Sequence, residues 1–261
     1  MKRATLGLTL VYTSLIFIGL AFTSISHAEI DPETLIAAWL LDEKQGKEVK
    51  DQSENGNDGN LIAGKWEAGQ FGNALDFDGK VNGVDIPESD SLNDVEDLSM
   101  LTWVYLRRGV TSGTWNAVVG KNPYPNGYLV WIQVPIEPAG LAYVGGARHQ
   151  VVSGVQLDLK KWYHLAFTRA GSGDMKFYID GKFIREAAGP KGEISTQPAP
   201  ITIAGQSPQT LDGLVDEVLL FNTVLEEDDI QTFVDKGFVA ALAVSPTGKL
   251  ATSWGKLKAA Y

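Results

Sequence analysis

The stretch that decides the fold runs from Met175 to Arg185 and reads MKFYIDGKFIR. Its two halves are rich in aromatic and β-branched residues, which favour strands. Between them stands Asp180-Gly181, a pair that accepts the positive φ angles of a two-residue type I′ turn. The stretch therefore predicts an antiparallel β-hairpin that turns at Asp180-Gly181.

Strand patterns recur on both sides of this hairpin. Apolar, aromatic and branched residues bounded by turn formers occupy 36–41, 74–79, 101–106, 162–169 and 214–221. The segment 51–59 between the first two is dominated by Asp, Asn, Ser and Gly, so we expect an ordered polar loop there. Short strands separated by turn signals favour an all-β, antiparallel two-sheet sandwich over an α/β fold.

One short peripheral helix is expected near the C-terminal end of the domain. Ile230, Phe233 and Val234 share a face over 226–236, acidic residues fill the first turn, and Gly237 follows. The segments 137–154 and 189–200 are rich in glycine, proline and small residues, so loops are predicted for both.

The N-terminus predicts export. A positive start, Met1-Lys2-Arg3, precedes an apolar run that ends near Phe22, and Ser26-His27-Ala28 has the small-x-small form of a cleavage site. The rival interpretation is a membrane anchor, because about 17 apolar-biased residues lie at the lower limit for spanning a bilayer. We expect a signal peptide over 1–28, one domain over 29–238, and a tail of open role over 239–261.

Composition narrows the partners. The 261 residues include no cysteine, so neither disulfides nor thiolate-bound zinc can stabilise the fold. A formal net charge of −10 opposes general binding to nucleic acid. We expect a protein that is secreted, periplasmic or attached to the cell surface, with no membrane span after the signal is removed.

Several segments, in this order, resemble the laminin-G-like, concanavalin A-like jelly-roll domains of bacterial secreted proteins. They are 39–43 with Gly46, the loop 51–59, 72–79, 162–166, 177–182, and 213–218 with Phe221-Asn222. The resemblance covers about 37–237 and implies a two-sheet jelly roll. Its members include carbohydrate binders, adhesion modules and domains attached to enzymes, so function depends on a site and not on the fold.

The resemblance also implies a structural calcium ion, because related domains often bind one through carboxylates and backbone carbonyls. The matching positions are Asp42, Asp51, Asn57 and Asp216. The competing explanation is that Asp and Asn in such loops merely satisfy backbone amides. Because neighbours in a strand point to opposite faces, we expect only one of Asp216 and Glu217 to face the site.

A sugar site needs aromatic rings that stack on pyranose faces, with polar groups that bond the hydroxyls. The segment 114–128 has this mixture on expected loops, and the next loop adds two polar residues. The candidate ligand-binding residues are Trp115, Tyr124, Tyr128, Arg148 and His149. The competing explanation is that the aromatic residues belong to the sandwich core.

A catalytic function is not favoured. Jelly-roll glycosidases carry Glu-x-Asp-x-x-Glu on one strand, but here Glu88-Ser89-Asp90 is followed by Asn93 at the last position. His164 lies in an expected strand, where a structural role is favoured. The sequence predicts a non-catalytic binding module for a glycan or another extracellular or surface component, calcium-stabilised. The alternatives are an adhesive protein-interaction domain and, after it, a polysaccharide-cleaving enzyme.

Overall fold

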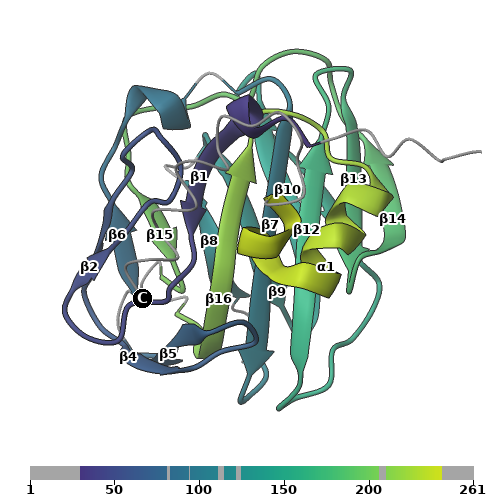
Figure 1. The fold of residues 1–261 in the computed structure, drawn as a ribbon. Coiled ribbons are helices and arrows are strands. Elements are labelled where there is room, and N and C mark those ends of the chain that lie inside the picture. Colours follow the sequence, from purple (N-terminus) through teal and green to yellow (C-terminus); the bar gives the residue numbers. More distant parts are fainter. Residues whose placement is uncertain are drawn as a thin grey trace, which may run out of the picture.

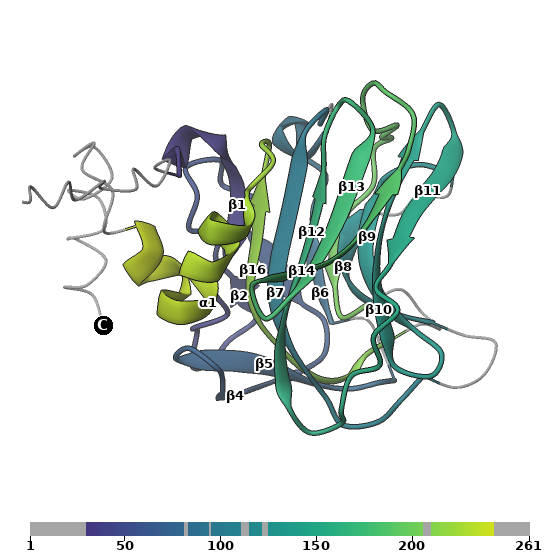
Figure 2. The ribbon, with the colours of Figure 1, turned by 90° about the vertical axis from the view of Figure 1, so that its right-hand side faces the viewer.

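A computed structural model describes residues 30–80, 83–93, 95–110, 115–121, 125–205 and 210–242. They form two antiparallel sheets packed face to face, with helix α1 (Glu227–Leu242) against the outside of one sheet (Figure 1, Figure 2). The predicted all-β sandwich is therefore confirmed. Neither α1 nor the short helices η1 (Pro32–Thr34) and η2 (Asp90–Leu92) combine the length and apolar character needed to cross a bilayer.

Sheet A has eight strands and carries the helix. Its strands are β1 (Leu35–Trp39), β4 (Lys65–Ala68), β5 (Asn73–Asp78), β7 (Leu98–Leu106), β12 (Trp162–Arg169), β13 (Asp174–Ile179), β14 (Lys182–Ala188) and β16 (Asp212–Phe221). They lie in the order β14-β13-β12-β7-β16-β5-β4, and β1 also pairs with β16. The first and last strands of the domain are thus neighbours.

Sheet B also has eight strands. They are β2 (Glu48–Val49), β3 (Gly59–Leu61), β6 (Val84–Ile86), β8 (Trp115–Lys121), β9 (Tyr128–Gln133), β10 (Glu137–Val144), β11 (Ala147–Val152) and β15 (Ile201–Ile203). Their order is β11-β10-β9-β8-β15-β6-β3-β2. Figure 2 shows β8, β9, β10 and β11 on the side of the molecule away from α1.

The predicted hairpin is confirmed as β13 and β14. Asp180 and Gly181 have φ angles of 50° and 77°, as a type I′ turn requires, and Ile179 pairs with Lys182 across the turn. The strands expected at 36–41, 74–79, 101–106, 162–169 and 214–221 correspond to β1, β5, β7, β12 and β16. The loop over 189–200 contains no strand.

The loop predicted over 137–154 is wrong, because this segment is the hairpin of β10 and β11. Gly145 and Gly146 form its turn with φ angles of 59° and 75°, and Val144 pairs with Ala147. Two consecutive glycines suit a type I′ turn as well as they suit a flexible loop. The small residues and glycines in this segment are typical of loops, so the two strands were not recognised from the sequence.

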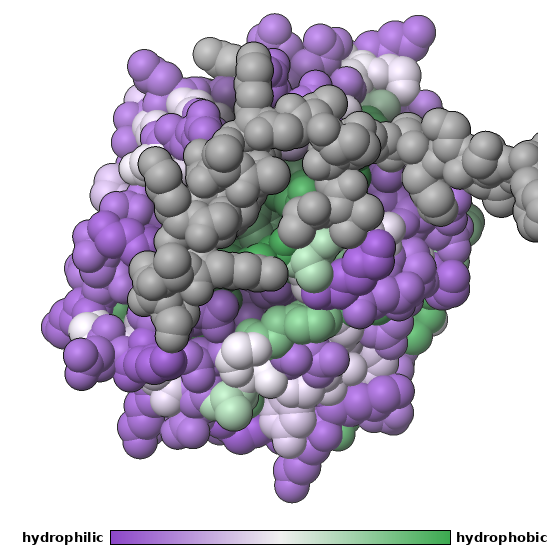
Figure 3. Space-filling model, viewed as in Figure 1, coloured by the Kyte–Doolittle hydropathy of each residue, from purple (hydrophilic) through white to green (hydrophobic). Residues whose placement is uncertain are grey.

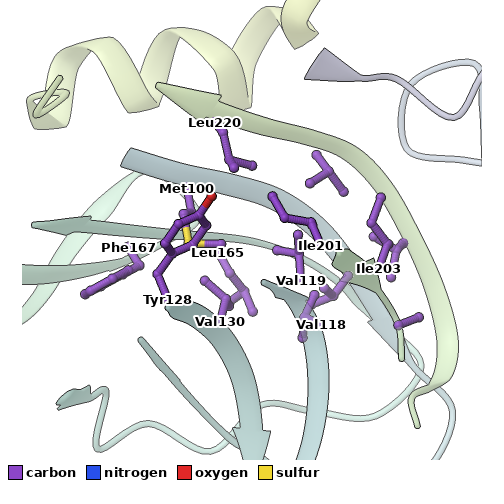
Figure 4. Packing of buried hydrophobic residues seen from close by; sticks show 14 of the residues in the cluster. Met100, Val118, Val119, Tyr128, Val130, Leu165, Phe167, Ile201, Ile203 and Leu220 are labelled. Carbon is purple, nitrogen blue, oxygen red and sulfur yellow. The ribbon is translucent and has the colours of Figure 1, made fainter. Parts of the chain in front are cut away.

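The main core lies between the sheets. Figure 4 shows Met100, Leu165, Phe167 and Leu220 of sheet A facing Tyr128, Val130 and other apolar residues of sheet B. Gly140 allows the sheets to approach, since a Cβ there would lie 2.2 Å from the Phe167 ring. Burial of this much apolar surface is the dominant favourable contribution to folding.

A second core lies between sheet A and α1, and it contains Leu219, Phe221, Phe233 and Phe238. The helix extends beyond the predicted end at Lys236 and continues to Leu242, with a break at Gly237. It therefore crosses the predicted boundary at 238, and 239–242 of the expected tail are helical. Figure 3 shows apolar side chains near the middle of this face, which is otherwise largely hydrophilic where it is coloured.

The expected signal peptide, 1–28, lies outside the described residues.

Candidate functional site

Two regions combine the side chains that a binding protein needs. The first is the carboxylate pocket, formed by Asp42, Asp216 and Glu217 with the loop 69–73. Asp42 follows β1, and the two other acids lie in β16, which pairs with β1 and with β5. The pairing of the first and last strands thus brings together acids that are far apart in the sequence.

The loop 69–73 supplies backbone donors to two of these acids. The amide of Phe71 donates to Asp216 Oδ2 at 2.9 Å, and the amide of Asn73 donates to Asp42 Oδ1 at 2.7 Å. Gly72 has a φ of 65°, and a Cβ on it would lie only 2.0 Å from Asp42 Oδ1. The glycine therefore lets the loop approach the carboxylate closely enough for both bonds.

The pocket destabilises negative charge. Burial raises the pKa of Asp216 to about 8, and the charges of Glu217 and Asp42 contribute to the rise. Burial also raises the pKa of Glu217 to about 7 and raises that of Asp42. Asp216 Oδ1 is buried and has no hydrogen-bond partner. A bound proton or cation would relieve this arrangement.

Calcium fits the donor set at Asp42 and Asp216. It takes six to eight oxygen ligands and accepts carboxylates, backbone carbonyls and water. The unpaired oxygen of Asp216 is a free ligand position beside a second carboxylate. No three His, Asp or Glu side chains converge as a metal-binding group within the described ranges, so an ion bound there would need backbone oxygens or water to complete its shell.

Asp51 and Asn57, the two other predicted calcium ligands, have different partners. Both carboxylate oxygens of Asp51 accept backbone amides, from Ala38 and Ser53 at Oδ1 and from Asn57 at Oδ2. Asn57 donates its side-chain amide to the Ile36 carbonyl and accepts from the Ser91 hydroxyl. The structure therefore uses these two residues to hold the polar loop against β1, as the competing explanation expected.

The alternation argument for Asp216 and Glu217 is overturned by a β-bulge. The register of β16 against β7 shifts between Asp216 and Leu219, and Glu217 has a φ of 44°. A bulge redirects side chains that regular pleating would send to opposite faces. Both acids consequently lie close enough to interact through their charges.

The second region is the aromatic face, the outward side of sheet B formed by β8, β9, β10 and β11. Cross-strand pairing places Ala117 beside Trp131, Trp131 beside Ala139, and Tyr143 beside Arg148. These residues alternate with core residues along each strand. The apolar residues among them belong to a cluster separate from the main core, which also contains Leu129 and Leu141.

Arg148 covers the middle of the aromatic face. Its guanidinium lies 5.0 Å from the centre of the Trp131 ring, and this ring is only 2% exposed whereas Arg148 is exposed. Trp115 packs half-buried at the margin, opposite Gln133, whose side-chain amide donates to Glu137 at 2.9 Å. Trp131 and Tyr143 are only 2% and 3% exposed, so the groups that this face presents to a ligand are Arg148, the half-buried Trp115, and the side chains of Gln133 and Glu137.

The predicted ligand-binding residues divide between this face and the interior. Trp115 and Arg148 both lie on the aromatic face, although in strands and not in the expected loops. Tyr128 is fully buried between the sheets and donates to the Leu92 carbonyl, which corrects the expectation of an exposed ring (Figure 4). His149 follows Arg148 in β11 and so points to the opposite side of the sheet. Tyr124 lies outside the described residues.

Sequence reasoning missed Trp131 and Tyr143. Their signal was alternation: Trp131 stands between the core residues Val130 and Ile132, and Tyr143 follows the core residue Ala142. An aromatic residue at an outward position of a half-covered sheet is a candidate for ligand contact. The loop prediction over 137–154 prevented that inference for Tyr143.

Two further places were considered for chemistry. Glu88 lies in a loop and Asp90 in η2, where Asn93 donates to Glu88 at 2.7 Å, so the incomplete glycosidase pattern is not on a strand. His164 is 2% exposed, and burial lowers its pKa to about 3. Its ring packs edge-on against Trp103, at 5.2 Å between centroids. A neutral, enclosed imidazole of this kind serves packing and not proton transfer.

A shallow hollow of about 200 Å³ lies beside β5. Its lining residues are Ala63, Gly64, Lys65, Asp76, Phe77, Asp78 and Arg107. The charged group at its centre, Arg107, is already paired with Asp76 and with Asp212. These two ion pairs already neutralise the charge of Arg107, so the hollow does not need a charged ligand.

Comparison with known proteins agrees with this architecture. Residues 78–231, more than half of the chain, match the family model described as the concanavalin A-like lectin/glucanases superfamily. No curated protein sequence matches the chain significantly. The match includes strands of both sheets and the start of α1, and it begins at the last residue of β5.

Solved structures resemble the fold at low sequence identity. Domain 4 of AbnA, an extracellular arabinanase of Geobacillus stearothermophilus in complex with arabinotriose, is 16% identical with a TM-score of 0.62, over 77% of this chain and 98% of that one. The binding domain of Paraclostridial Mosquitocidal Protein 1 is 14% identical with a TM-score of 0.65, over 78% and 52%. The binding domain of botulinum neurotoxin DC in complex with rat synaptotagmin II is 15% identical with a TM-score of 0.62, over 79% and 52%. The chain therefore spans about half the length of the toxin binding domains, and identities this low establish the fold alone.

Proposed function

The chain belongs to the concanavalin A-like lectin/glucanase superfamily, and from this premise we propose that it is a non-catalytic extracellular module that binds carbohydrate through the aromatic face of sheet B. The fold is compatible with several functions, so the proposal depends on the site. Export through the N-terminal segment 1–28 is part of the proposal, as is a structural calcium ion.

The arrangement of Arg148 over Trp131 beside Trp115 carries the proposal. A sugar ring has an apolar face that stacks on aromatic carbon and hydroxyls that accept from guanidinium and amide groups. Trp115 offers a partly exposed ring, Arg148 offers five N–H donors, and Gln133 and Glu137 add polar groups at the margin. All of them lie on paired strands, which hold the side chains in place more rigidly than loops do.

Asp42 and Asp216 are the residues that would hold calcium. A bound ion would supply positive charge to a buried pair of carboxylates and a shared ligand centre for the segments after β1 and within β16. The unpaired Asp216 Oδ1 supports this assignment. The loop 69–73 orients both carboxylates through the amides of Phe71 and Asn73.

The relatives support the class of partner without identifying it. The arabinanase domain was solved with arabinotriose, and a toxin binding domain was solved with a protein, rat synaptotagmin II. A sugar partner is proposed here because the aromatic face combines stacking surface with hydroxyl-binding groups. The remaining class, an adhesive contact with a protein, is an outcome of the test below.

The test is affinity electrophoresis of the purified protein through gels that contain arabinan, xylan or laminarin, each run with calcium and with chelator. We expect at least one polysaccharide to retard the protein. Arg148→Ala should weaken that retardation about tenfold or more, because it removes the charged donor and the group that orders the Trp131 ring.

Arg185→Ala is the matched control, because Arg185 is an exposed arginine on β14 of the other sheet. It should leave retardation unchanged. Equal loss in both variants would indicate a general charge effect and contradict the aromatic face as the site. Absence of retardation by every polysaccharide would reject the carbohydrate proposal and favour a protein partner.

A further inference from the structure

Helix α1 is divided by a break at Gly237, which has φ 68° and ψ 168°. The residues 238–242 form a second helical segment whose side chains Phe238, Ala241 and Leu242 are buried against sheet A. A helical segment that restarts exposes backbone amides without intrahelical partners. Here the amide of Phe238 donates to Glu217 Oε1 at 2.9 Å, so an acid of the carboxylate pocket caps the segment.

Phe71 forms a second link between the pocket and the break. A Cβ on Gly237 would lie 2.9 Å from the Phe71 ring and 3.0 Å from Glu217 Oε1, so both side chains touch the break. The amide of the same Phe71 donates to Asp216 Oδ2. The loop 69–73 therefore contacts the carboxylate of Asp216 with its backbone and the helix with its ring.

Both links involve the same group of neighbouring carboxylates. The negative charge of Glu217 interacts unfavourably with Asp216 and with Asp42. A divalent cation bound by Asp42 and Asp216 would reduce this repulsion and would hold Asp216 in place, together with the neighbouring Glu217 of the same bulge, which accepts the Phe238 amide. The same cation would restrict the loop that holds Phe71 against Gly237.

We infer that calcium bound at Asp42 and Asp216 strengthens the docking of residues 238–242 onto sheet A, through Glu217 and Phe71. The inference rests on the calcium site of the proposed function. Coupling between two events is reciprocal, so docking of the segment also raises the affinity of the pocket for calcium. The end of the helix thereby responds to the ion, although none of its side chains is a ligand.

The experiment is amide hydrogen exchange of the purified protein in calcium and in chelator, with thermal unfolding measured in parallel. We expect the midpoint of unfolding to rise with calcium, because an ion that binds only the folded state stabilises it. We also expect peptides that cover 238–242 to exchange at least tenfold more slowly in calcium. The β13–β14 hairpin, 175–185, is the internal reference and should change less.

Two variants separate the links from the metal site. Phe71→Ala keeps the backbone amide that donates to Asp216, so calcium should still raise its unfolding midpoint, by less than in the wild type because the coupling is reciprocal. It should lose most of the calcium effect on exchange at 238–242. Glu217→Gln keeps an acceptor oxygen but no charge, and should reduce the effect without removing it. Phe183→Ala, at an exposed phenylalanine of β14, is the matched control and should behave as the wild type.

The outcomes distinguish the two proposals. If calcium leaves the unfolding midpoint unchanged, the calcium site of the proposed function is rejected and the coupling is rejected with it. If calcium raises the midpoint but exchange at 238–242 changes no more than in the reference hairpin, the site stands and the coupling is rejected. If Phe71→Ala does not fold, Glu217→Gln decides the same question.

Discussion

The outer faces of sheets A and B are covered by different parts of the chain. On sheet A, α1 covers the strands, and Phe233 packs between Phe221 and Phe238. On sheet B, the apolar residues are shielded by neighbours such as Arg148, which lies on Trp131. A helix that contributes a second core makes a face unavailable to ligands, whereas a face covered by single side chains can exchange them for a ligand.

The largest effect should follow from breaking the helix-covered face. Phe233→Ala removes a buried ring that contacts two other aromatic rings, so we expect unfolding to become easier by about 3–5 kcal/mol. Phe183→Ala, at a ring that is 44% exposed, should cost less than about 1 kcal/mol. Urea unfolding measures both. A loss near 1 kcal/mol for Phe233→Ala would mean that α1 contributes little to covering sheet A.

A smaller, pH-dependent effect should come from His164 of the same sheet, which pairs with Trp103 and packs against its ring. Its folded pKa is about 3, below the ordinary 6.5, so between these values the unfolded chain binds a proton that the folded protein does not. Stability is therefore lost as the pH falls, by about 2 kcal/mol between pH 6.5 and 5. His164→Phe should remove this loss.

The readout for His164 is the difference in unfolding free energy between wild type and His164→Phe, measured in chelator at each pH. Asp216 and Glu217 have raised pKa values, so their contributions change with the opposite sign over part of this range. The difference between the two proteins cancels those contributions. A difference that does not change with pH would show that folding leaves the pKa of His164 at its ordinary value.

The smallest effect on stability should come from the aromatic face. Arg148→Ala removes an exposed cation from the Trp131 ring, and contacts of this kind contribute about 0.5–1 kcal/mol. Urea unfolding should therefore show a loss below about 1 kcal/mol, even though the same change should weaken the proposed carbohydrate binding. A loss above about 2 kcal/mol would mean that Arg148 closes this face as firmly as α1 closes the other, and the contrast between the faces would disappear.

Local sequence rules predicted the parts of the fold that have local causes. The positive φ angles of Asp180 and Gly181 suit a tight hairpin turn, so the pair predicted the β13–β14 hairpin. The continuous apolar run of β1 predicted a strand that is covered on both faces, and all five of its residues are buried. Gly145-Gly146 obeys the same turn rule, but the flanking residues were too small and mixed for their strands to be recognised. A turn signal therefore predicts a hairpin only where the strands beside it can be recognised as well.

The candidate sites were less accessible to sequence reasoning because they depend on distant pairings. Motif resemblance found Asp42 and Asp216, but the bulge that turns Glu217 toward them has no marker in the sequence. Tyr128 and Trp131 are both aromatic residues of β9, and only the register of the strand decides that the first faces the core and the second faces outward.

The pairing of β1 with β16 has a consequence for how the protein folds. Leu35 pairs with Phe221, so β1 remains without its neighbour until nearly the whole domain has been synthesised. Contacts between such distant segments slow folding, because the chain must close a very long loop before it gains the contact. Until then β1 is an exposed apolar strand that can pair with another chain. We expect the efficiency of refolding to fall as the protein concentration rises, with this first strand as the segment most prone to aggregation.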